Sequence, residues 1–324
     1  MARVMASCLH LQRHFEKFRS EFADAGVEVF LPKVTGQQLT ADEMRAQLPG
    51  MTTVIAGDDP IDRAALVAAQ AQGLKAVIKW GIGTDSIDKV AAAELGIPVY
   101  NTPGAFGEEV GDLAMAYLLA LTRGLHRMDA SVREGGWLKI EGRSLSTLTA
   151  GVIGLGSIGR AICRRCAASG MKVVGYDAVA IDAPTLAASS VDQLPFDDVL
   201  AQSDAVLIAC NLTADNHHLM NAAAFARMKK GAYLVNVARG PIVDEKALIA
   251  ALQGGHLGGA GLDVFEVEPL PMDSPLRQLD NCVFGTHNGS NTQEAVDRVN
   301  RMTVEIALQV VGAKQASFTP NRVA

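Results

Sequence analysis

One glycine-rich stretch, GVIGLGSIGR at residues 151–160, constrains the fold of this chain more than any other segment. An apolar run before it predicts a strand, and the periodicity of residues 157–168 predicts a helix. At the joint, Gly154 permits a tight turn, Gly156 permits close approach of an anion, and Gly159 permits close helix–strand packing. Because the free N–H groups and the dipole of a helix N-terminus favour anions, this joint predicts a phosphate-binding turn.

A second strand, predicted at residues 171–177, ends in Asp177, 18 positions beyond Gly159. In a strand-turn-helix-strand unit, an acid about 20 residues after the glycines accepts hydrogen bonds from an adenosine ribose. The alternative is a tight αβ joint without a ligand, but the complete pattern favours dinucleotide binding. No arginine follows Asp177 to receive a 2′-phosphate, so we expect NAD rather than NADP. The expected cofactor contacts here are Gly154, Gly156, Ser157, Ile158, Gly159 and Asp177.

Length and charge narrow the class of protein. The 324 residues exceed one ordinary core, which predicts two domains. The net charge of −6 and the lack of a long basic run argue against nucleic-acid binding. The longest apolar run, residues 113–121, is too short to span a bilayer, and the charged N-terminus does not resemble a signal peptide. We therefore expect a cytoplasmic protein without a membrane partner.

Cysteine and histidine spacing gives little sign of metal or redox chemistry. The five cysteines are an odd number without framework spacing, which suits a reducing compartment. Cys163 and Cys166 form a C-x-x-C inside a predicted helix, so buried small side chains are favoured over a redox pair. His10 and His14 share a helix face, but no third ligand is evident. We expect no metal site.

The first part of the chain, residues 1–102, is predicted to be a small α/β domain, because short apolar runs alternate with helical patterns. Such alternation implies parallel strands joined by helical crossovers. The predicted strands are residues 4–6, 27–30, 53–56, 76–79 and 98–100, and the predicted helices are residues 11–24, 41–48, 61–72 and 86–94.

A long apolar segment, residues 108–125, predicts a buried helix after a hinge at Pro103 and Gly104. We expect a second domain or a second subunit to cover a helix this apolar. The aperiodic residues 135–146 predict an extended arm. Helix and arm together predict a homodimer.

From residue 148 onward the pattern predicts a Rossmann-type, doubly wound parallel sheet. Further strands are predicted at residues 205–210, 232–237, 260–264 and 282–286, with a short one near Val191, and helices at 221–229 and 244–253. The last helical pattern, residues 292–311, is expected to pack on the first domain. We therefore expect a discontinuous first domain, 1–102 with 292–324, and an NAD-binding domain, 103–291.

Three polar residues follow predicted strands of this sheet, namely Arg239, Glu268 and His287. In open α/β sheets the ligand crevice lies outside the carboxyl ends of the strands, so these side chains should converge there. A guanidinium can hold a carboxylate, an imidazole can exchange a proton, and a carboxylate can fix the imidazole tautomer. Taken singly, each residue could equally be a solvated cap, a turn or a hydrogen-bonded histidine. Their shared placement favours catalysis of hydride transfer.

Several strings resemble the NAD-dependent D-isomer-specific 2-hydroxyacid dehydrogenases over nearly the whole chain. They are GLGSIG at 154–159, NVARG at 236–240, LDVFEVEP at 262–269, TH at 286–287, KWGIGTD at 79–85 and NTPG at 101–104. This resemblance implies that Arg239 orients the substrate, that His287 is the acid/base, and that Glu268 is the partner of the histidine. It also implies a flavodoxin-like substrate domain at 1–102 and 292–324.

The resemblance extends to the binding residues. It implies that the substrate, a 2-keto or 2-hydroxy acid, is bound by Lys79, Trp80, Gly81, Ile82 and Gly83. The backbone amides of the loop from Gly81 to Gly83 would bind its carboxylate. It places four further residues at the cofactor, namely Cys210, Val237, Ala238 and Asp263.

The chain is most similar to the phosphoglycerate-dehydrogenase-like branch of that family, with one difference. Phosphate-binding members often carry an arginine after the third strand, where this chain reads AGDD at residues 56–59. Lys79 is the only cation nearby, and two acids would repel a phosphate, so a non-phosphorylated acid such as glyoxylate or hydroxypyruvate is an alternative substrate. Because the chain ends soon after the last predicted helix, we expect no C-terminal regulatory domain.

Two other functions remain open. Corepressor-like proteins that resemble these dehydrogenases use NAD to control association with partners, but no basic localisation run is present here. Formate oxidation is a second alternative, and it relies on other residues beside the histidine. The intact Arg239, Glu268 and His287 set favours a 2-keto acid.

Overall fold

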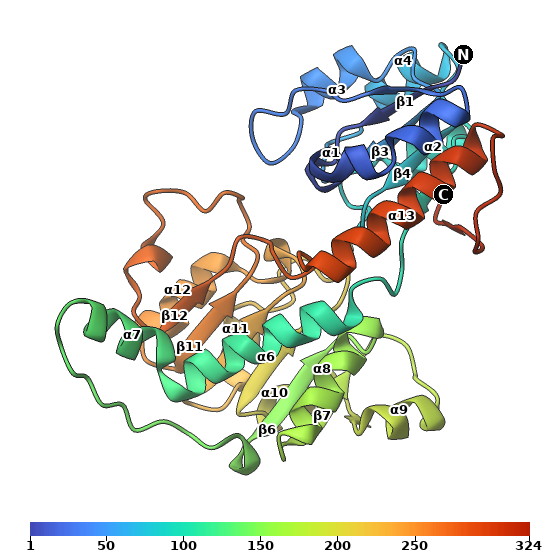
Figure 1. The fold of residues 1–324 in the computed structure, drawn as a ribbon. Helices are drawn as coiled ribbons and strands as arrows, with labels where there is room; N and C mark the ends of the chain where they lie inside the picture. Colours follow the sequence, from blue (N-terminus) through green and yellow to red (C-terminus); the bar gives the residue numbers. More distant parts are fainter. The chain divides into compact units, whose positions relative to one another are not determined.

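The computed structural model describes residues 1–324, and the chain forms two compact units. Unit 1 contains Met1–Ala105 and Thr292–Ala324, and unit 2 contains Phe106–Asn291. Each unit is a sheet covered by helices, parallel throughout in unit 2 and parallel except for the edge strand β13 in unit 1 (Figure 1). None of the helices combines the length and the apolar character that a membrane span requires.

Unit 1 is built on a six-stranded sheet of order β13-β5-β4-β3-β1-β2. Its strands are β1 (Arg3–Ala6), β2 (Glu28–Phe30), β3 (Thr53–Ala56), β4 (Ala76–Lys79), β5 (Val99–Asn101) and β13 (Asn321–Arg322). Its helices are α1 (Leu9–His14), α2 (Arg19–Asp24), α3 (Ala41–Gln47), α4 (Arg63–Gln70), α5 (Lys89–Glu94) and α13 (Gln293–Val310), with a 3₁₀ turn at Phe15–Lys17. The order of β1 to β5 is the flavodoxin-like order 2-1-3-4-5, which confirms the predicted fold class.

The burial pattern of unit 1 explains its strands. All residues of β3 and β4 are buried, as expected for central parallel strands covered on both faces. Helix α13 packs on β3 and β4 and contacts α1, whereas α3, α4 and α5 pack side by side. Local signals set the helix starts, because Thr40 and Glu43 form a capping box at α3 and Asp62 caps α4.

Unit 2 is built on a seven-stranded, fully parallel sheet of order β12-β11-β10-β9-β6-β7-β8. Its strands are β6 (Thr149–Ile153), β7 (Lys172–Tyr176), β8 (Asp192–Gln193), β9 (Ala205–Ile208), β10 (Ala232–Asn236), β11 (Leu257–Leu262) and β12 (Cys282–Phe284). Its helices are α6 (Gly107–Arg123), α7 (Leu125–Arg133), α8 (Ser157–Ala168), α9 (Ala183–Ser189), α10 (Phe196–Gln202), α11 (Ala222–Arg227) and α12 (Glu245–Gln253). Three 3₁₀ turns lie at Leu145–Thr147, Gly240–Ile242 and Pro275–Gln278.

The strand order of unit 2 reverses at β6, which pairs with β7 on one side and β9 on the other. This is the topological switch of a Rossmann-type sheet, and ligands bind outside the carboxyl ends of the strands at such a point. Helices α6 and α8 pack together on one face, and α10, α11 and α12 lie on the other (Figure 1). The predicted doubly wound sheet is therefore confirmed.

The long apolar helix differs from its prediction. Helix α6 ends at Arg123 because Gly124 adopts φ 62, and a separate helix α7 follows. Its buried residues pack against α8 and against β10, β11 and β12 of the same unit. The apolar face of α6 is thus buried within its own unit. The expectation that a second domain or a second subunit covers this helix was wrong.

Candidate active site

The glycine turn joins β6 to α8, as its sequence predicted. Gly154 adopts φ 94, and a Cβ there would lie 2.6 Å from the backbone nitrogen of Cys210. A Cβ at Gly159 would lie 1.8 Å from the carbonyl oxygen of Gly154. Both positions therefore exclude a side chain, because the turn, the helix and the end of β9 approach one another too closely.

The same turn leaves an open approach to the N-terminus of α8. Gly156 precedes the helix without a side-chain cap, and a Cβ there would meet nothing within 4 Å. The first two helical residues, Ser157 and Ile158, are half-buried. An uncapped N-terminus with an open face fits the pyrophosphate of a dinucleotide, because its N–H groups lack helical acceptors.

Asp177 lies directly after β7 and contacts this turn. Its Oδ2 accepts a 2.7 Å hydrogen bond from the amide of Leu155, and its Oδ1 accepts a 3.1 Å hydrogen bond from the amide of Val179. A carboxylate has about four acceptor positions, so two hydrogen bonds leave capacity for ribose hydroxyls. Asp177 thus fits NAD and places a negative charge where a 2′-phosphate would need a cation.

The other predicted cofactor residues lie at the carboxyl ends of β9, β10 and β11. Cys210 is half-buried, and burial raises the pKa of its thiol to about 11. Val237 and Ala238 are buried, and the amide of Ala238 donates to Asn236 Oδ1 at 3.1 Å. The Cys210 thiol is therefore neutral at physiological pH and acts as a small side chain rather than as a nucleophile.

Asp263 has a structural environment that the sequence did not reveal. Its side chain is buried and accepts hydrogen bonds from the Tyr117 hydroxyl at 3.1 Å and from the amides of Asn288 and Gly289 at 3.1 and 2.9 Å. Burial, and then the negative charge of Asp263, raise the pKa of Tyr117. The carboxylate of Asp263 thus supports the loop that carries His287. The available signal for Tyr117 was a phenol on a buried face of α6 that is otherwise apolar apart from Thr122.

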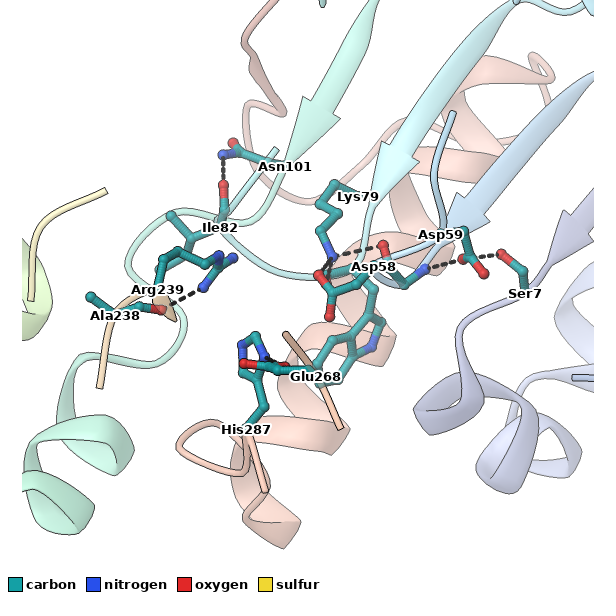
Figure 2. Close-up of polar contacts among 12 residues, drawn as sticks. Ser7, Asp58, Asp59, Lys79, Ile82, Asn101, Ala238, Arg239, Glu268 and His287 are labelled. Atoms are coloured by element: carbon teal, nitrogen blue, oxygen red, sulfur yellow. Dashed lines mark hydrogen bonds and ion pairs between the residues drawn. The ribbon is translucent and has the colours of Figure 1, made fainter. Parts of the chain in front are cut away.

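His287 and Glu268 meet in the structure (Figure 2). The distance between His287 Nδ1 and Glu268 Oε2 is 2.9 Å, and the two side chains are 30% and 24% exposed. Glu268 Oε1 also accepts from the amide of Phe265 at 3.0 Å, which fixes the carboxylate. If Nδ1 carries its proton toward Glu268, Nε2 is left to face a reacting group.

Arg239 follows β10 at the start of a 3₁₀ turn. Its Nη1 donates to the carbonyl of Ala238 at 2.9 Å, and its own carbonyl accepts from Asn236 Nδ2 at 2.9 Å. The next residue, Gly240, packs directly on the backbone of Phe265, because a Cβ there would lie 1.8 Å from the Phe265 carbonyl oxygen. The segment bearing Arg239 therefore contacts the segment that leads to Glu268.

The predicted substrate loop lies in unit 1 after β4. The carbonyls of Gly81 and Ile82 accept hydrogen bonds from Thr102 N at 3.0 Å and from Asn101 Nδ2 at 2.8 Å. The amide N–H groups of Gly81, Ile82 and Gly83 form no hydrogen bond within the chain. A loop whose carbonyls are held while its amides are available suits an anionic ligand.

Side-chain contacts fix the start of this loop. Trp80 Nε1 donates to the buried Asn300 Oδ1 at 2.7 Å, and its ring stacks on His10 at 4.5 Å between centroids. Burial, and then Arg13, lower the pKa of His10. A mostly neutral imidazole is therefore packed on the indole, and Trp80 acts as a buried anchor of the loop.

The remaining candidates are structural. Cys163 and Cys166 are buried, Cys166 Sγ lies 3.5 Å from Met115 Sδ, and burial raises the pKa of each thiol to about 12. No group of three or more His, Cys, Asp or Glu side chains is arranged to hold a metal ion.

Comparison with known proteins identifies the family. The D-isomer specific 2-hydroxyacid dehydrogenase NAD-binding domain matches residues 115–289, more than half of the chain. The chain belongs to this dehydrogenase family. Its cofactor is NAD, and it is an oxidoreductase that acts on CH–OH groups.

Individual relatives of this dehydrogenase differ in their named substrates. It is 37% identical over 287 residues to a hydroxypyruvate reductase of Thermotoga maritima, covering 86% of this chain and 91% of the relative. It is also 37% identical over 296 residues to a D-3-phosphoglycerate dehydrogenase of Rattus norvegicus, covering 90% of this chain but 54% of the relative. A D-lactate dehydrogenase from Aquifex aeolicus, solved with NAD and lactic acid, superposes with a TM-score of 0.84 at 26% identity and covers 96% of both chains. Similarity therefore identifies the reaction class of the dehydrogenase but not its acid.

Proposed function

We propose that the dehydrogenase reduces a small 2-keto acid, with Arg239, Glu268 and His287 as its catalytic residues. The contact of 2.9 Å between His287 Nδ1 and Glu268 Oε2 is the observation that carries this assignment. A carboxylate at that distance stabilises the imidazolium and fixes which nitrogen faces the substrate. Glu268 thus keeps a proton available on Nε2.

The proposed chemistry follows from where charge develops. When bound, the dinucleotide supplies the hydride. As the carbonyl carbon is reduced, negative charge grows on its oxygen, and His287 Nε2 donates a proton to that oxygen. Arg239 holds the substrate carboxylate and stabilises the same developing charge, because a guanidinium can donate two parallel hydrogen bonds. In the oxidative direction the neutral His287 accepts the proton.

The proposal assigns binding residues to each unit separately. In unit 1, the amides of Gly81, Ile82 and Gly83 bind the carboxylate of the substrate, supported by the free donors of that loop. Unit 1 is then the substrate domain, and unit 2 is the NAD-binding domain. The proposed cofactor contacts in unit 2 are Gly154, Gly156, Ser157, Ile158, Gly159, Asp177, Cys210, Val237, Ala238 and Asp263.

We further propose a cytoplasmic homodimer. All five cysteines are free and four are buried, which suits a reducing compartment. Helix α7 buries none of its residues, and the arm after it exposes Trp137 and Leu138. Exposed apolar side chains gathered on one segment are typical of a protein interface.

The proposal is tested by following NADH oxidation with glyoxylate, hydroxypyruvate, pyruvate and 3-phosphohydroxypyruvate in parallel. The protein should turn over at least one of these acids.

The substitution His287→Ala should lower kcat by about 10²–10⁴-fold, which is the usual contribution of general acid catalysis, while NADH still binds. Arg239→Ala should also raise KM, because it removes a ground-state contact.

Replacing the exposed His217 by alanine serves as the matched control and should leave kcat close to that of the parent. Full activity of the His287→Ala protein, or no turnover of any keto acid by the parent, would refute the proposal.

A further inference from the structure

Lys79 lies at the carboxyl end of β4, and every N–H group of its ammonium is hydrogen-bonded within the protein. Its side chain is 4% exposed. Nζ donates to the Gly57 carbonyl at 2.7 Å, to Asp58 Oδ1 at 2.8 Å and to the Trp80 carbonyl at 3.4 Å (Figure 2). An ammonium has three N–H groups, so these three acceptors use all of them. Lys79 is therefore a buried, compensated cation that offers no free donor to a ligand.

The partner of Lys79 presents its charge outward. Asp58 lies in the loop after β3, and its side chain is 52% exposed. The neighbouring Asp59 is buried, and its carboxylate accepts from Ser7 Oγ at 2.7 Å and from the amides of Leu39 and Gly57 at 2.8 Å each. The two acids of this loop thus have different roles, because Asp59 shapes the loop and Asp58 remains at its surface.

The Asp58 carboxylate lies next to the loop assigned to the substrate carboxylate. Strands β3 and β4 are adjacent, with Ala56 opposite Lys79, and Trp80 N donates to the Ala56 carbonyl at 2.8 Å. The Lys79 ammonium joins the Asp58 carboxylate to the Trp80 carbonyl, where the Gly81–Gly83 loop begins. The exposed Asp58 carboxylate is therefore linked to the start of this loop through a single side chain, that of Lys79.

This arrangement discriminates between substrates by charge. A phosphate group needs a cation or several free donors, whereas Lys79 has no free N–H group and its single positive charge stands against the two carboxylates of Asp58 and Asp59. A carboxylate can instead accept hydrogen bonds from hydroxyl groups. We propose that Asp58, held by Lys79, is a specificity-determining residue that selects 2-keto acids with a small or hydroxylated, uncharged tail over phosphorylated ones. This inference rests on the proposed reduction of 2-keto acids and on the proposed role of the Gly81–Gly83 loop.

The test compares kcat/KM for hydroxypyruvate and 3-phosphohydroxypyruvate with NADH. The parent protein should prefer hydroxypyruvate by at least about tenfold, because each unfavourable 1.4 kcal/mol changes the ratio tenfold. Asp58→Asn keeps the shape and the acceptor oxygen for Lys79 but removes one negative charge. The ratio should then move toward the phosphorylated acid by about tenfold or more.

The matched control is Asp42→Asn, which removes an exposed carboxylate from α3 of the same unit. It should leave the ratio unchanged. The inference is overturned if the parent protein has equal kcat/KM for the two acids. It is also overturned if Asp58→Asn leaves the ratio of the two kcat/KM values unchanged.

A binding measurement separates this inference from the proposed function. Calorimetry with D-glycerate and 3-phospho-D-glycerate, each added to the parent with NAD, needs no turnover. Weaker binding of the phosphorylated acid by the parent, with the difference reduced in Asp58→Asn, supports charge selection even if no keto acid is reduced. Equal or tighter binding of the phosphorylated acid by the parent overturns it even if reduction is observed.

Discussion

At the scale of single residues, the conformation of His287 needs explanation, because it is a non-glycine residue with φ 55. A left-handed conformation of this kind costs about 1–3 kcal/mol and persists only where the surrounding structure imposes it. The amide of His287 donates to the Asp263 carbonyl at 2.7 Å, and the next two amides donate to the Asp263 carboxylate. The buried Asp263 therefore holds the turn, and the imidazole is placed by backbone geometry as well as by Glu268.

The first residue-scale prediction concerns Glu268. In Glu268→Gln the amide oxygen can still accept from His287 Nδ1, but the charge that stabilises the imidazolium is lost. The proposed mechanism of reduction requires the protonated His287 ring, so the alkaline decline of kcat/KM should begin at lower pH. A shift of about one pH unit is expected, since a hydrogen bond to a charged group contributes about 1.5–3 kcal/mol and one unit corresponds to 1.36 kcal/mol. The pH profile of NADH-dependent reduction measures it.

The neighbouring Glu266 provides the control. Its Oε1 lies 2.9 Å from His218 Nε2 and also accepts from the amide of Glu245 at 2.9 Å. Glu266→Gln should leave the alkaline limb where it is. If kcat/KM declines at the same alkaline pH in the parent and Glu268→Gln proteins, another group protonates the substrate.

At the scale of elements, some segments could be predicted from sequence and others could not. Strands β3 and β4 match their predicted residues, 53–56 and 76–79, because central strands are continuous apolar runs. The pattern at residues 11–24 was predicted as one helix, but a 3₁₀ turn at Phe15–Lys17 divides it into α1 and α2. The two-residue strand β13 was missed, because its pairing with β5 joins residues about 220 positions apart.

The same distinction applies to the candidate site. Positions after the strands of a parallel sheet follow from topology, so the sequence could place Arg239, Glu268 and His287 at one edge. Side-chain partners far apart in sequence could not be found in this way. Tyr117 reaches Asp263 across 146 positions, and Lys79 reaches Asp58 across 21. Neither contact leaves a local pattern in the sequence.

The element-scale prediction concerns the turn between β6 and α8. Asp177→Ala removes a carboxylate that opposes a 2′-phosphate and also the acceptor of the Leu155 amide. The preference for NADH over NADPH in kcat/KM should fall by about tenfold or more, since relief of about 1.4 kcal/mol of repulsion changes the ratio tenfold. Because the turn loses a contact, KM for NADH should also rise. Equal use of NADH and NADPH by the parent would contradict the prediction.

At the scale of the whole molecule, the segment after α6 carries several exposed apolar side chains close together in sequence. Leu125 and Val132 on α7 are 59% and 54% exposed, and Trp137 in the arm is 81% exposed. An indole that is 81% exposed buries little apolar area in the single chain, although aromatic side chains contribute most when they are buried. Trp and Tyr are also enriched among the residues that dominate interface energetics. The segment from α7 through the arm is therefore the surface on which the proposed homodimer depends.

The whole-molecule prediction is that light scattering at micromolar concentration gives twice the chain mass of 34.1 kDa. Trp137→Ser should weaken the dimer by about 2 kcal/mol or more, which raises the dissociation constant at least about thirtyfold. Met272 lies on a different segment and is 85% exposed, so Met272→Ser removes a comparable apolar side chain without touching α7 or the arm. It should leave the mass unchanged. A monomeric parent would contradict the dimer, and equal masses for the parent and Trp137→Ser proteins at every dilution would mean that the interface lies elsewhere.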